Sequence, residues 1–398
     1  MLSSTQPFVR DRLTWLAYAM LAYIGFSQSI LGPLMPFLRT ELGLNYTLGG
    51  FLPATLAIGL ILSGLFGDWL ARHRSRRGVF WSGAIGLGAS VVLLGWSHSF
   101  ELALIAVLGM GFGSSLTQVM IQALLADQHA ERRAIALTEA NVAASLSTTL
   151  TPLVIASLQG TGVGWRTIPV FVILFLTLLA ITFYGQSIPD STAAGTQSVE
   201  DRGRLPFSFW LYWMVLFLVV AVEMSMVVWA TDFLDTVAGL SRIDAVLGFS
   251  TFPAAMLVGR IAGSRLTRRW SSLTLLLIAL LVTLIGFVIF WLSPLATLNI
   301  LGLFITGLGI ANLYPLTLSV AIGLAADQSN RASARISLGV GTALFTAPLL
   351  LGWLADRLSL QNAYSMVIVL MVVACAIVMN NRSRSDRRVV SSLYGKIK

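Results

Sequence analysis

The feature that most constrains this chain is a series of continuous apolar runs, each 20 or more residues long, separated by short polar segments. About 20 apolar residues in a helix are needed to cross the ~30 Å hydrocarbon core of a bilayer. The composition agrees, because 56% of the residues are apolar and 11% are charged, against about 25% charged in soluble domains. A membrane β-barrel would instead show alternating segments of about ten residues. The sequence therefore predicts an all-α membrane protein.

Twelve runs are long enough to span a membrane. They lie at 13–38, 48–71, 78–97, 101–125, 134–158, 167–187, 208–234, 243–266, 271–293, 296–324, 335–358 and 363–381. The segment 188–207 is the only long polar stretch between them, and its Pro, Gly, Ser and charged residues are typical of a flexible linker. We therefore expect an N-terminal six-helix bundle (1–187), a cytoplasmic linker (188–207) and a C-terminal six-helix bundle with a basic tail (208–398).

The basic residues predict the orientation. With both termini in the cytoplasm, only four of the 26 Lys and Arg residues lie on the outer side, in loops or at span ends, and only Arg260 lies well inside a span. Cytoplasmic loops carry such an excess of Lys and Arg in membrane proteins. The net charge of +9 is explained by this topology, so we expect no nucleic-acid partner.

The two halves of the chain resemble each other. GMGFGSSLTQVMIQALLADQ (109–128) returns as GLGIANLYPLTLSVAIGLAADQ (307–328), TPLV (151–154) returns as APLL (347–350), and the basic end of LARHRSRR (70–77) returns in LTRRW (266–270). These offsets of 196–200 residues indicate an internal repeat. A duplicated six-span unit is typical of transporters that bind their substrate between two halves.

The second span ends in GLFGDWLARHRSRR (64–77). This segment resembles the signature loop of the major facilitator superfamily, with Asp68 and a basic end that includes Arg72. It departs from the pattern where Trp69 replaces the usual Arg and Ala71 the usual Gly. We expect Asp68 and Arg72 to take part in gating by charge-assisted hydrogen bonds. Alternatively, the arginines only fix the topology.

Other short patterns, such as LGPLMPFL (31–38) and GIANLYPLTLS (309–319), resemble the fucose and sugar permease branch of that superfamily. The resemblance implies twelve helices in two pseudo-symmetric bundles, with spans one, four, seven and ten lining a central cavity. Amide, hydroxyl and phenol groups on these spans suit a polar, hydroxyl-rich solute, although small polar residues also hold membrane helices together. The expected substrate-binding residues of these spans are Tyr23, Ser27, Gln28, Gln118, Gln122, Trp229, Asn312 and Tyr314.

One carboxylate stands near the middle of the seventh span. A charge at the bilayer centre is costly, so Glu223 in VVAVEMSMVVWATDFL (219–234) predicts a functional site. Because a desolvated carboxyl group readily binds a proton, we expect Glu223 to carry the coupling proton. The alternative is a permanently protonated or hydrogen-bonded structural residue. Asp232, about 13 Å further along the helix and on the opposite face, is expected to be a solvated helix-end residue. Trp229 could stack on a sugar, pack in the core or belong to an aromatic belt.

The fifth span carries a polar stripe of hydroxyl and amide side chains bordered by Glu139. We expect Glu139 and Asn141 to face the cavity, with Glu139 as a second proton-coupling residue and Asn141 as a substrate ligand. The alternative is an interfacial Glu139 paired with Arg132 or Arg133. Arg260 in the eighth span is expected to form an ion pair between the halves, or to snorkel, in preference to binding ligand.

These features predict a secondary active transporter that works by alternating access, with proton-coupled symport of a small neutral polar solute such as a sugar. The alternative is a proton-coupled exporter of hydrophobic cations. An enzyme is not expected, since neither a nucleophile–His pair nor a metal-ligand set lies inside the predicted spans. We expect no cofactor, the proton gradient as energy source, a monomer, and a multi-pass location in a bacterial-type cytoplasmic membrane.

Overall fold

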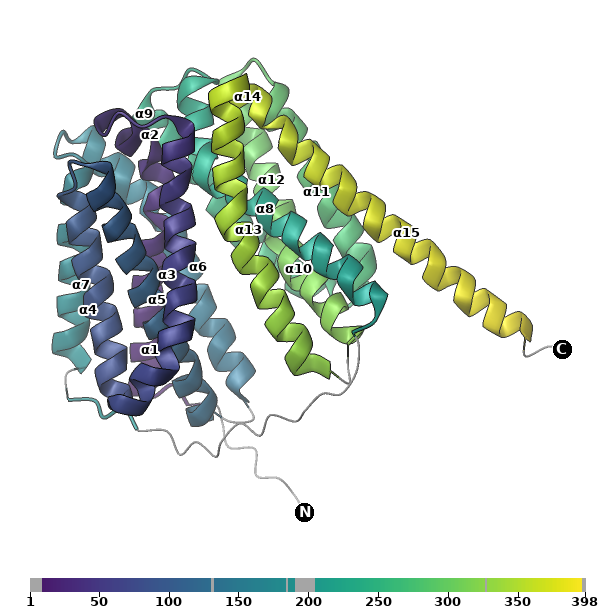
Figure 1. The fold of residues 1–398 in the computed structure, drawn as a ribbon, viewed down its shortest axis with the longest axis horizontal. Helices are drawn as coiled ribbons and strands as arrows, with labels where there is room; N and C mark the ends of the chain where they lie inside the picture. The colour runs from purple at the N-terminus through teal and green to yellow at the C-terminus, as the bar shows by residue number, and fades with distance from the viewer. Residues whose placement is uncertain (1–8, 130–131, 184, 190–204, 326–327, 396–398) are drawn as a thin grey trace. The chain divides into compact units, whose positions relative to one another are not determined.

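The computed structural model describes residues 9–129, 132–183, 185–189, 205–325 and 328–395, and every regular element within these ranges is a helix (Figure 1). Twelve helical segments are long and apolar enough to cross a membrane. This confirms the predicted number of spans. The elements are α1 (Arg12–Ser29), α2 (Leu31–Glu41), α3 (Tyr46–His73), α4 (Arg76–Gly95), α5 (Phe100–His129), α6 (Arg133–Gly160), the 3-10 turn η2 (Trp165–Thr167), α7 (Ile168–Phe183), α8 (Phe207–Thr236), α9 (Arg242–Phe249), α10 (Thr251–Leu266), α11 (Ser272–Leu292), α12 (Ala296–Gly323), α13 (Ser329–Leu358), α14 (Leu360–Ala363) and α15 (Ser365–Gly395).

Short polar residues start several of these helices. Asp11 caps α1 by accepting a hydrogen bond from the Thr14 amide at 2.9 Å. Ser75 and Ser271 cap α4 and α11 in the same way. Such caps satisfy amides that have no partner within the helix. Pro315 lies inside α12, which continues through it to Gly323.

The helices form two compact units. Unit 1 comprises residues up to Leu34 together with Thr55–Thr196, and unit 2 comprises Met35–Ala54 together with Gln197–Lys398. The boundary at 196/197 lies inside the predicted linker, whose residues 190–204 fall outside the described ranges. Unit 2 thus contains one segment, Met35–Ala54, that the sequence assigned to the first bundle.

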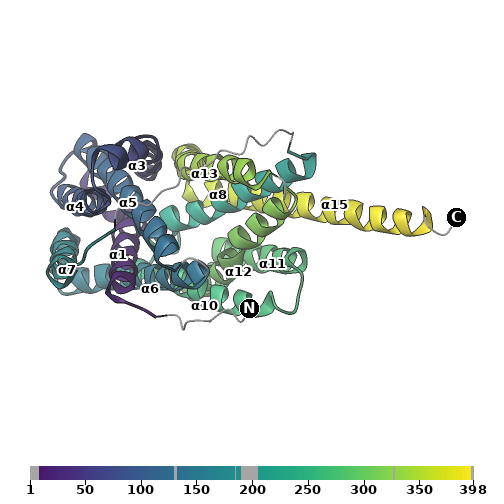
Figure 2. The same ribbon diagram turned by 90° about the horizontal axis from the view of Figure 1, so that it is seen from below.

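Corresponding helices pack together in the two units. In unit 1, α4 packs on α5 and α1 on α6; in unit 2, α11 packs on α12 and α13 on α8. Figure 2 shows the helices of each unit from a second direction. A Cβ atom added to Gly113 would lie 2.7 Å from the Gly83 carbonyl oxygen, and one added to Gly309 would lie 2.8 Å from the Ala279 carbonyl oxygen. Gly309 follows Gly113 by 196 residues, and Ala279 follows Gly83 by the same number. This supports the internal repeat.

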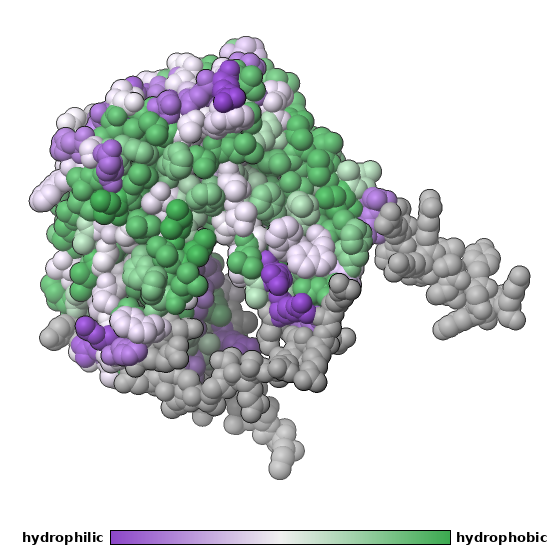
Figure 3. All heavy atoms as spheres, in the orientation of Figure 1, coloured by the Kyte–Doolittle hydropathy of each residue, from purple (hydrophilic) through white to green (hydrophobic). Residues whose placement is uncertain are grey.

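The outer surface of the helices is largely apolar. Figure 3 shows hydrophobic side chains over the middle of the helices on one face and hydrophilic side chains gathered at the loops. Helix α7, for example, exposes Leu174, Leu178 and Ile181 by more than half of their surface. Apolar groups are stable on such a surface when hydrocarbon covers them.

Candidate functional site

Glu223 lies near the middle of α8 and its side chain is partly buried. In the described part of the chain it makes no hydrogen bond and no ion pair. Two other side chains, Arg260 of α10 and Tyr314 of α12, lie close enough to interact electrostatically with the Glu223 carboxyl group. The carboxyl group is therefore available to exchange a proton or to meet a ligand.

These three side chains come from three helices of unit 2. Arg260 is exposed, while Tyr314 is half-buried one residue before Pro315. The structure thus places together Glu223, predicted for proton coupling, Arg260, predicted for gating, and Tyr314, predicted for substrate binding. Sequence spacing could not show this proximity, since about 90 residues separate the first from the last.

The expectation that Asp232 is solvated is wrong. Its side chain is buried in unit 2, and Oδ1 accepts a hydrogen bond from Arg39 Nη1 at 2.6 Å. The predicted separation of the two carboxylates is nevertheless reasonable, because Asp232 shares a fully buried face of α8 with Ser225 and Trp229, whereas Glu223 keeps some exposure. The burial arises because Met35–Ala54 covers this end of α8 within unit 2.

Aromatic rings enclose the Arg39–Asp232 ion pair. The Arg39 guanidinium carbon lies 3.4 Å from the centroid of the Tyr46 ring, and Tyr46 meets Trp229 edge to face at 5.6 Å. Trp229 is fully buried, and its indole N–H donates to the Pro348 carbonyl at 3.0 Å. Of the three roles considered for Trp229, core packing fits this position; its predicted role in substrate binding has no support here.

A carboxylate and two glycines hold the start of α3 against α13. Asp356 accepts hydrogen bonds from the amides of Tyr46 and Thr47 at 2.8 and 2.7 Å. A Cβ atom on Gly50 would lie 2.9 Å from the Leu349 Cα, and one on Gly352 would lie closer still to the Tyr46 carbonyl oxygen. Only residues without a Cβ permit such contact, so this part of unit 2 is tightly packed.

Glu139 has a different environment from both alternatives in the sequence analysis. Two nitrogens of Arg10 donate hydrogen bonds to the Glu139 carboxylate at 2.8 and 2.6 Å. The Tyr18 hydroxyl donates a third to the same carboxylate at 2.9 Å. The carboxylate raises the pKa of the Arg10 guanidinium by hydrogen bonding and charge. Neither Asn141 nor Arg132 and Arg133 supplies a bond to it in the described structure; Asn141 is exposed and donates to the Leu137 carbonyl.

The remaining predicted ligands of α1 differ in burial. Tyr23 is fully buried, and its hydroxyl donates to the Ala84 carbonyl at 3.0 Å, so it joins α1 to α4. Ser27 is also fully buried, and its hydroxyl has no hydrogen-bond partner among the described residues. Gln28 is partly buried and donates to Ser114 at 2.7 Å. Tyr23 and Gln28 thus serve helix packing in this conformation.

The other predicted residues are scattered. On α5, Gln118 is partly buried and Gln122 is exposed. Asn312 on α12 donates to the Gly259 carbonyl at 2.8 Å, which joins α12 to α10. Asp68 and Arg72 lie in the last turns of α3, but their side chains are outside the description, so their gating role stays a prediction.

The carboxylates of the spans could be identified from the sequence, but the arginines that pair with them could not. Arg10 and Arg39 lie outside the predicted first span (13–38), yet each binds a carboxylate on a distant helix. One signal was available for Arg39: the helical pattern of the first span continues past it, and the spanning segment reaches Glu41. Nothing in the local sequence indicated that Arg10 would reach Glu139, 129 residues away.

Comparisons with known proteins agree with this architecture. An uncharacterized MFS-type transporter of Yersinia pestis is 26% identical over 366 residues, which cover 88% of this chain and 91% of the relative. Among solved structures, a bacterial homolog of the human lysosomal transporter Spinster superimposes with a TM-score of 0.75 at 16% identity, covering 94% of this chain and 97% of that one. A D-xylose-proton symporter superimposes with a TM-score of 0.73 at 17% identity, covering 92% and 96%.

At these identities the two structural neighbours establish the fold alone. The sequence model of the Major Facilitator Superfamily, however, matches residues 17–327, most of the chain. Together with the twelve membrane-spanning segments and the two units, this match shows that the chain is an integral membrane transporter belonging to the major facilitator superfamily.

Proposed function

We propose that this transporter is a proton-coupled symporter of a small neutral polar solute such as a sugar, working by alternating access as a monomer in a bacterial cytoplasmic membrane with both termini inside. The observation that carries the proposal is Glu223, an acid in the middle of a membrane span without a hydrogen bond or ion pair in the described structure. An intramembrane carboxyl group is costly unless it is neutralised, and it marks ion pathways in membrane proteins.

Proton binding at Glu223 would change the charge balance with Arg260. When Glu223 is ionised, it attracts the Arg260 guanidinium through the low-dielectric span. When it is protonated, that attraction ends, and α8 and α10 are free to adopt a second arrangement. Tyr314, close enough to sense the charge of Glu223, supplies a hydroxyl for a polar solute. A ligand that binds only one arrangement would then couple its movement to the proton.

Glu139 is assigned a secondary role in coupling. Its carboxylate is paired with Arg10 and accepts a hydrogen bond from Tyr18, so release of Arg10 would favour its protonation. Exposed or partly buried amides, Gln118, Gln122 and Asn141, remain the proposed solute ligands of unit 1. The choice of a sugar is supported by these amides and by the fold shared with a D-xylose-proton symporter.

A second candidate is proton-coupled export of hydrophobic cations. It is favoured by one observation: Trp213 and Phe217, both partly exposed on α8, stack at 6.3 Å with ring planes 19° apart. Stacked aromatic faces attract organic cations, and Glu223 on the same helix would then bind either the cation or a proton. The two candidates differ in the chemistry of the ligand, so they can be separated by experiment.

The first experiment identifies the ligand class. Purified protein is screened by thermal shift against sugars, amino acids and cationic dyes at two pH values. The best ligand is then tested in proteoliposomes that contain a pH-sensitive dye. The proposal expects that a neutral sugar stabilises the protein and that its entry carries protons inward. Stabilisation by dyes alone, with protons moving against the ligand, would favour export.

The second experiment tests Glu223. Glu223→Gln keeps the shape and removes the titration, so we expect exchange of solute between equal concentrations to persist while uphill uptake driven by a pH gradient is lost. Glu101→Gln, at the exposed start of α5, is the matched control and should behave as the unmodified protein. Undiminished uphill uptake with unchanged pH dependence in Glu223→Gln would remove Glu223 from the coupling role.

A further inference from the structure

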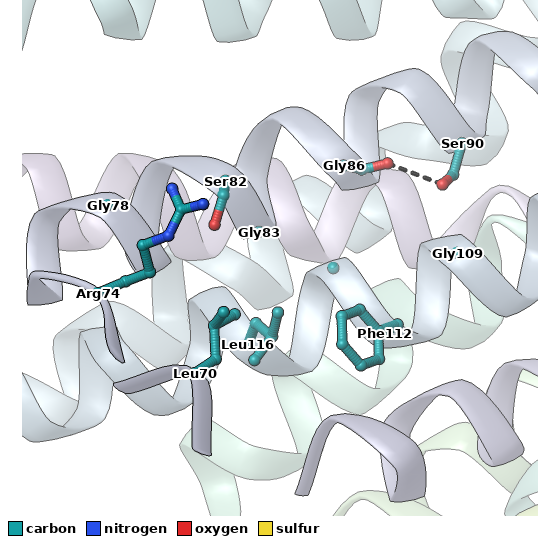
Figure 4. A pocket seen from close by; sticks show the side chains of 11 residues that line it. Leu70, Arg74, Gly78, Ser82, Gly83, Gly86, Ser90, Gly109, Phe112 and Leu116 are labelled. Carbon is teal, nitrogen blue, oxygen red and sulfur yellow. Dashed lines mark hydrogen bonds between the residues drawn. The ribbon is translucent and has the colours of Figure 1, made fainter. Parts of the chain in front are cut away.

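Unit 1 contains a cavity of about 380 Å³ that the transport proposal does not use. It lies where the end of α3 and the following turn meet α4 and α5, and Figure 4 shows it from close by. Its lining is made of small and apolar residues with one cation: Leu70, Arg74, Gly78, Ser82, Gly83, Gly86, Ser90, Gly109, Phe112, Gly113 and Leu116.

The walls of this cavity are apolar in effect. The hydroxyl of Ser82 donates to the Val79 carbonyl. The hydroxyl of Ser90 donates to the Gly86 carbonyl (Figure 4), so both hydroxyls are satisfied within α4. A Cβ atom added to Gly86 would meet no atom within 4 Å. Apart from Arg74 at one end, the side chains that line this space offer no free polar group, so it suits a hydrocarbon chain and offers water few partners.

The surface around the cavity faces hydrocarbon. Ile85 follows Ser82 by three residues on α4, and Ile105 precedes Gly109 by four residues on α5, so each lies on the face of its helix that borders the cavity. These two side chains are 58% and 59% exposed. Large exposed aliphatic side chains in a membrane span are stable against lipid and costly against water.

The guanidinium of Arg74 lies at one end of the cavity. Arg74 follows the last residue of α3, His73, so it lies at the membrane end of the span. Its exposed side chain extends over the cavity toward Ser82 (Figure 4) and makes no hydrogen bond or ion pair with any described residue. From Gly78 to Ser90 the cavity follows α4 for about 18 Å, close to the roughly 15 Å of hydrocarbon in one leaflet.

The internal repeat provides a comparison within the chain. Unit 2 has a cavity of about 250 Å³ between α10, α11 and α12. Seven of its lining residues stand 196 positions after lining residues of the first cavity: Leu266, Ile278, Ala279, Val282, Leu308, Gly309 and Asn312. Here Ile278 and Val282 occupy the positions of Ser82 and Gly86, and the lining contains no cation. The first cavity is thus the wider of the two and the only one of the pair with a guanidinium.

We propose that the cavity of unit 1 binds one acyl chain of an anionic phospholipid, whose phosphate pairs with Arg74. Arginine binds phosphate oxygens through two parallel N–H donors. The acyl chain gains little by leaving other lipids, since lipid tails are as apolar as the cavity walls. Selectivity must therefore come from the headgroup, and one arginine near a membrane surface corresponds to about a five-fold preference for an anionic lipid. The proposal does not depend on the transported solute.

Photolabelling of the full-length protein in nanodiscs tests this site. The probe is phosphatidylglycerol with a photoreactive group in its acyl chain, and labelled positions are mapped by peptide mass spectrometry. Labels should concentrate on α4 and α5, and unlabelled phosphatidylglycerol should compete about five-fold better than phosphatidylcholine. Soluble glycerol phosphate should not compete, because it lacks the chain; competition by it would reveal a plain phosphate site and overturn the proposal.

Four variants separate headgroup from chain. Arg74→Gln should abolish the preference for the anionic lipid, and Arg74→Lys should retain most of it. Arg77→Gln removes a nearby charge at the start of α4 that does not line the cavity, so it should leave the preference unchanged. Ser82→Ile with Gly86→Val copies the unit 2 cavity and should reduce labelling of α4 and α5 several-fold. Equal labelling in the filled variant, or an unchanged preference in Arg74→Gln, would refute the proposal; since the two variants act through different groups, misfolding of one leaves the other decisive.

Discussion

The buried ion pair of unit 2 offers the sharpest prediction about stability. Arg39 and Asp232 are joined at 2.6 Å with side chains only 15% and 2% exposed. The remaining buried polar atoms of the pair, Asp232 Oδ2 and Arg39 Nε, have no hydrogen-bond partner among the described residues. At a charge separation of about 4 Å and an effective dielectric constant of about 20, the attraction is about 4 kcal/mol. Removing one partner of such a pair typically costs about 3–5 kcal/mol.

The two single substitutions should differ. Arg39→Met leaves a carboxylate enclosed without its cation, so we expect a loss of about 3–5 kcal/mol, or a fall in Tm on the order of 5 °C. Asp232→Asn leaves a less deeply buried guanidinium that still lies on the Tyr46 ring at 3.4 Å, so its cost should be about 1–3 kcal/mol. The double variant should be more stable than Arg39→Met, with a coupling energy of at least about 2 kcal/mol.

The assay is thermal unfolding of the purified protein and the three variants in one detergent. The matched control is a second pair on the same side of unit 2, Arg242 and Asp235, which are 3.5 Å apart with 42% and 20% exposure. That pair should show a coupling of about 0.2–1 kcal/mol, typical of exposed ion pairs. A coupling energy below about 0.5 kcal/mol for Arg39 and Asp232 would refute the reasoning from burial.

Three further predictions concern packing and anchoring. Gly50→Ala should lower Tm, because its Cβ would lie 2.9 Å from the Leu349 Cα, whereas Gly86→Ala, with open space at its Cβ, should be neutral or stabilise by up to about 1 kcal/mol; equal effects in the same melting assay would contradict the close approach. Asp356→Ala removes the acceptor of two α3 amides and should cost about 1 kcal/mol, which unchanged melting would disprove. Arg10→Ala should speed limited proteolysis near residue 10, because Glu139 holds Arg10 through two hydrogen bonds; a cleavage rate equal to that of the unmodified protein would argue against that anchor.

Much of the fold could be predicted because membrane insertion is a local property of sequence. A run of about 20 apolar residues must be helical in hydrocarbon, since its backbone groups have no other partners there. The twelve spans follow from this rule. The repeat was also visible, and its physical consequence appears in the paired close contacts at Gly113 and Gly309.

The candidate site was predictable only in part. The depth of Glu223 followed from its place in α8, because the cost of a charge depends on how far it lies from the membrane surface. The proximity of Arg260 and Tyr314 did not, since it requires α8, α10 and α12 to pack together. Trp229 illustrates the same limit: its position on α8 was clear, but its burial beneath Tyr46 depends on a helix about 180 residues away.

The sequence by itself therefore determined how many times the chain crosses the membrane, and which carboxylates belong to the spanning segments, because both depend on the transfer of single segments from water to hydrocarbon. The tertiary structure alone decided which of those carboxylates are neutralised. Asp232 pairs with Arg39, 193 residues away, and Glu139 pairs with Arg10, 129 residues away. Glu223 is left without such a partner in the described structure. Ion pairing depends on distances of a few ångströms, and those distances are set by packing between helices that are remote in sequence.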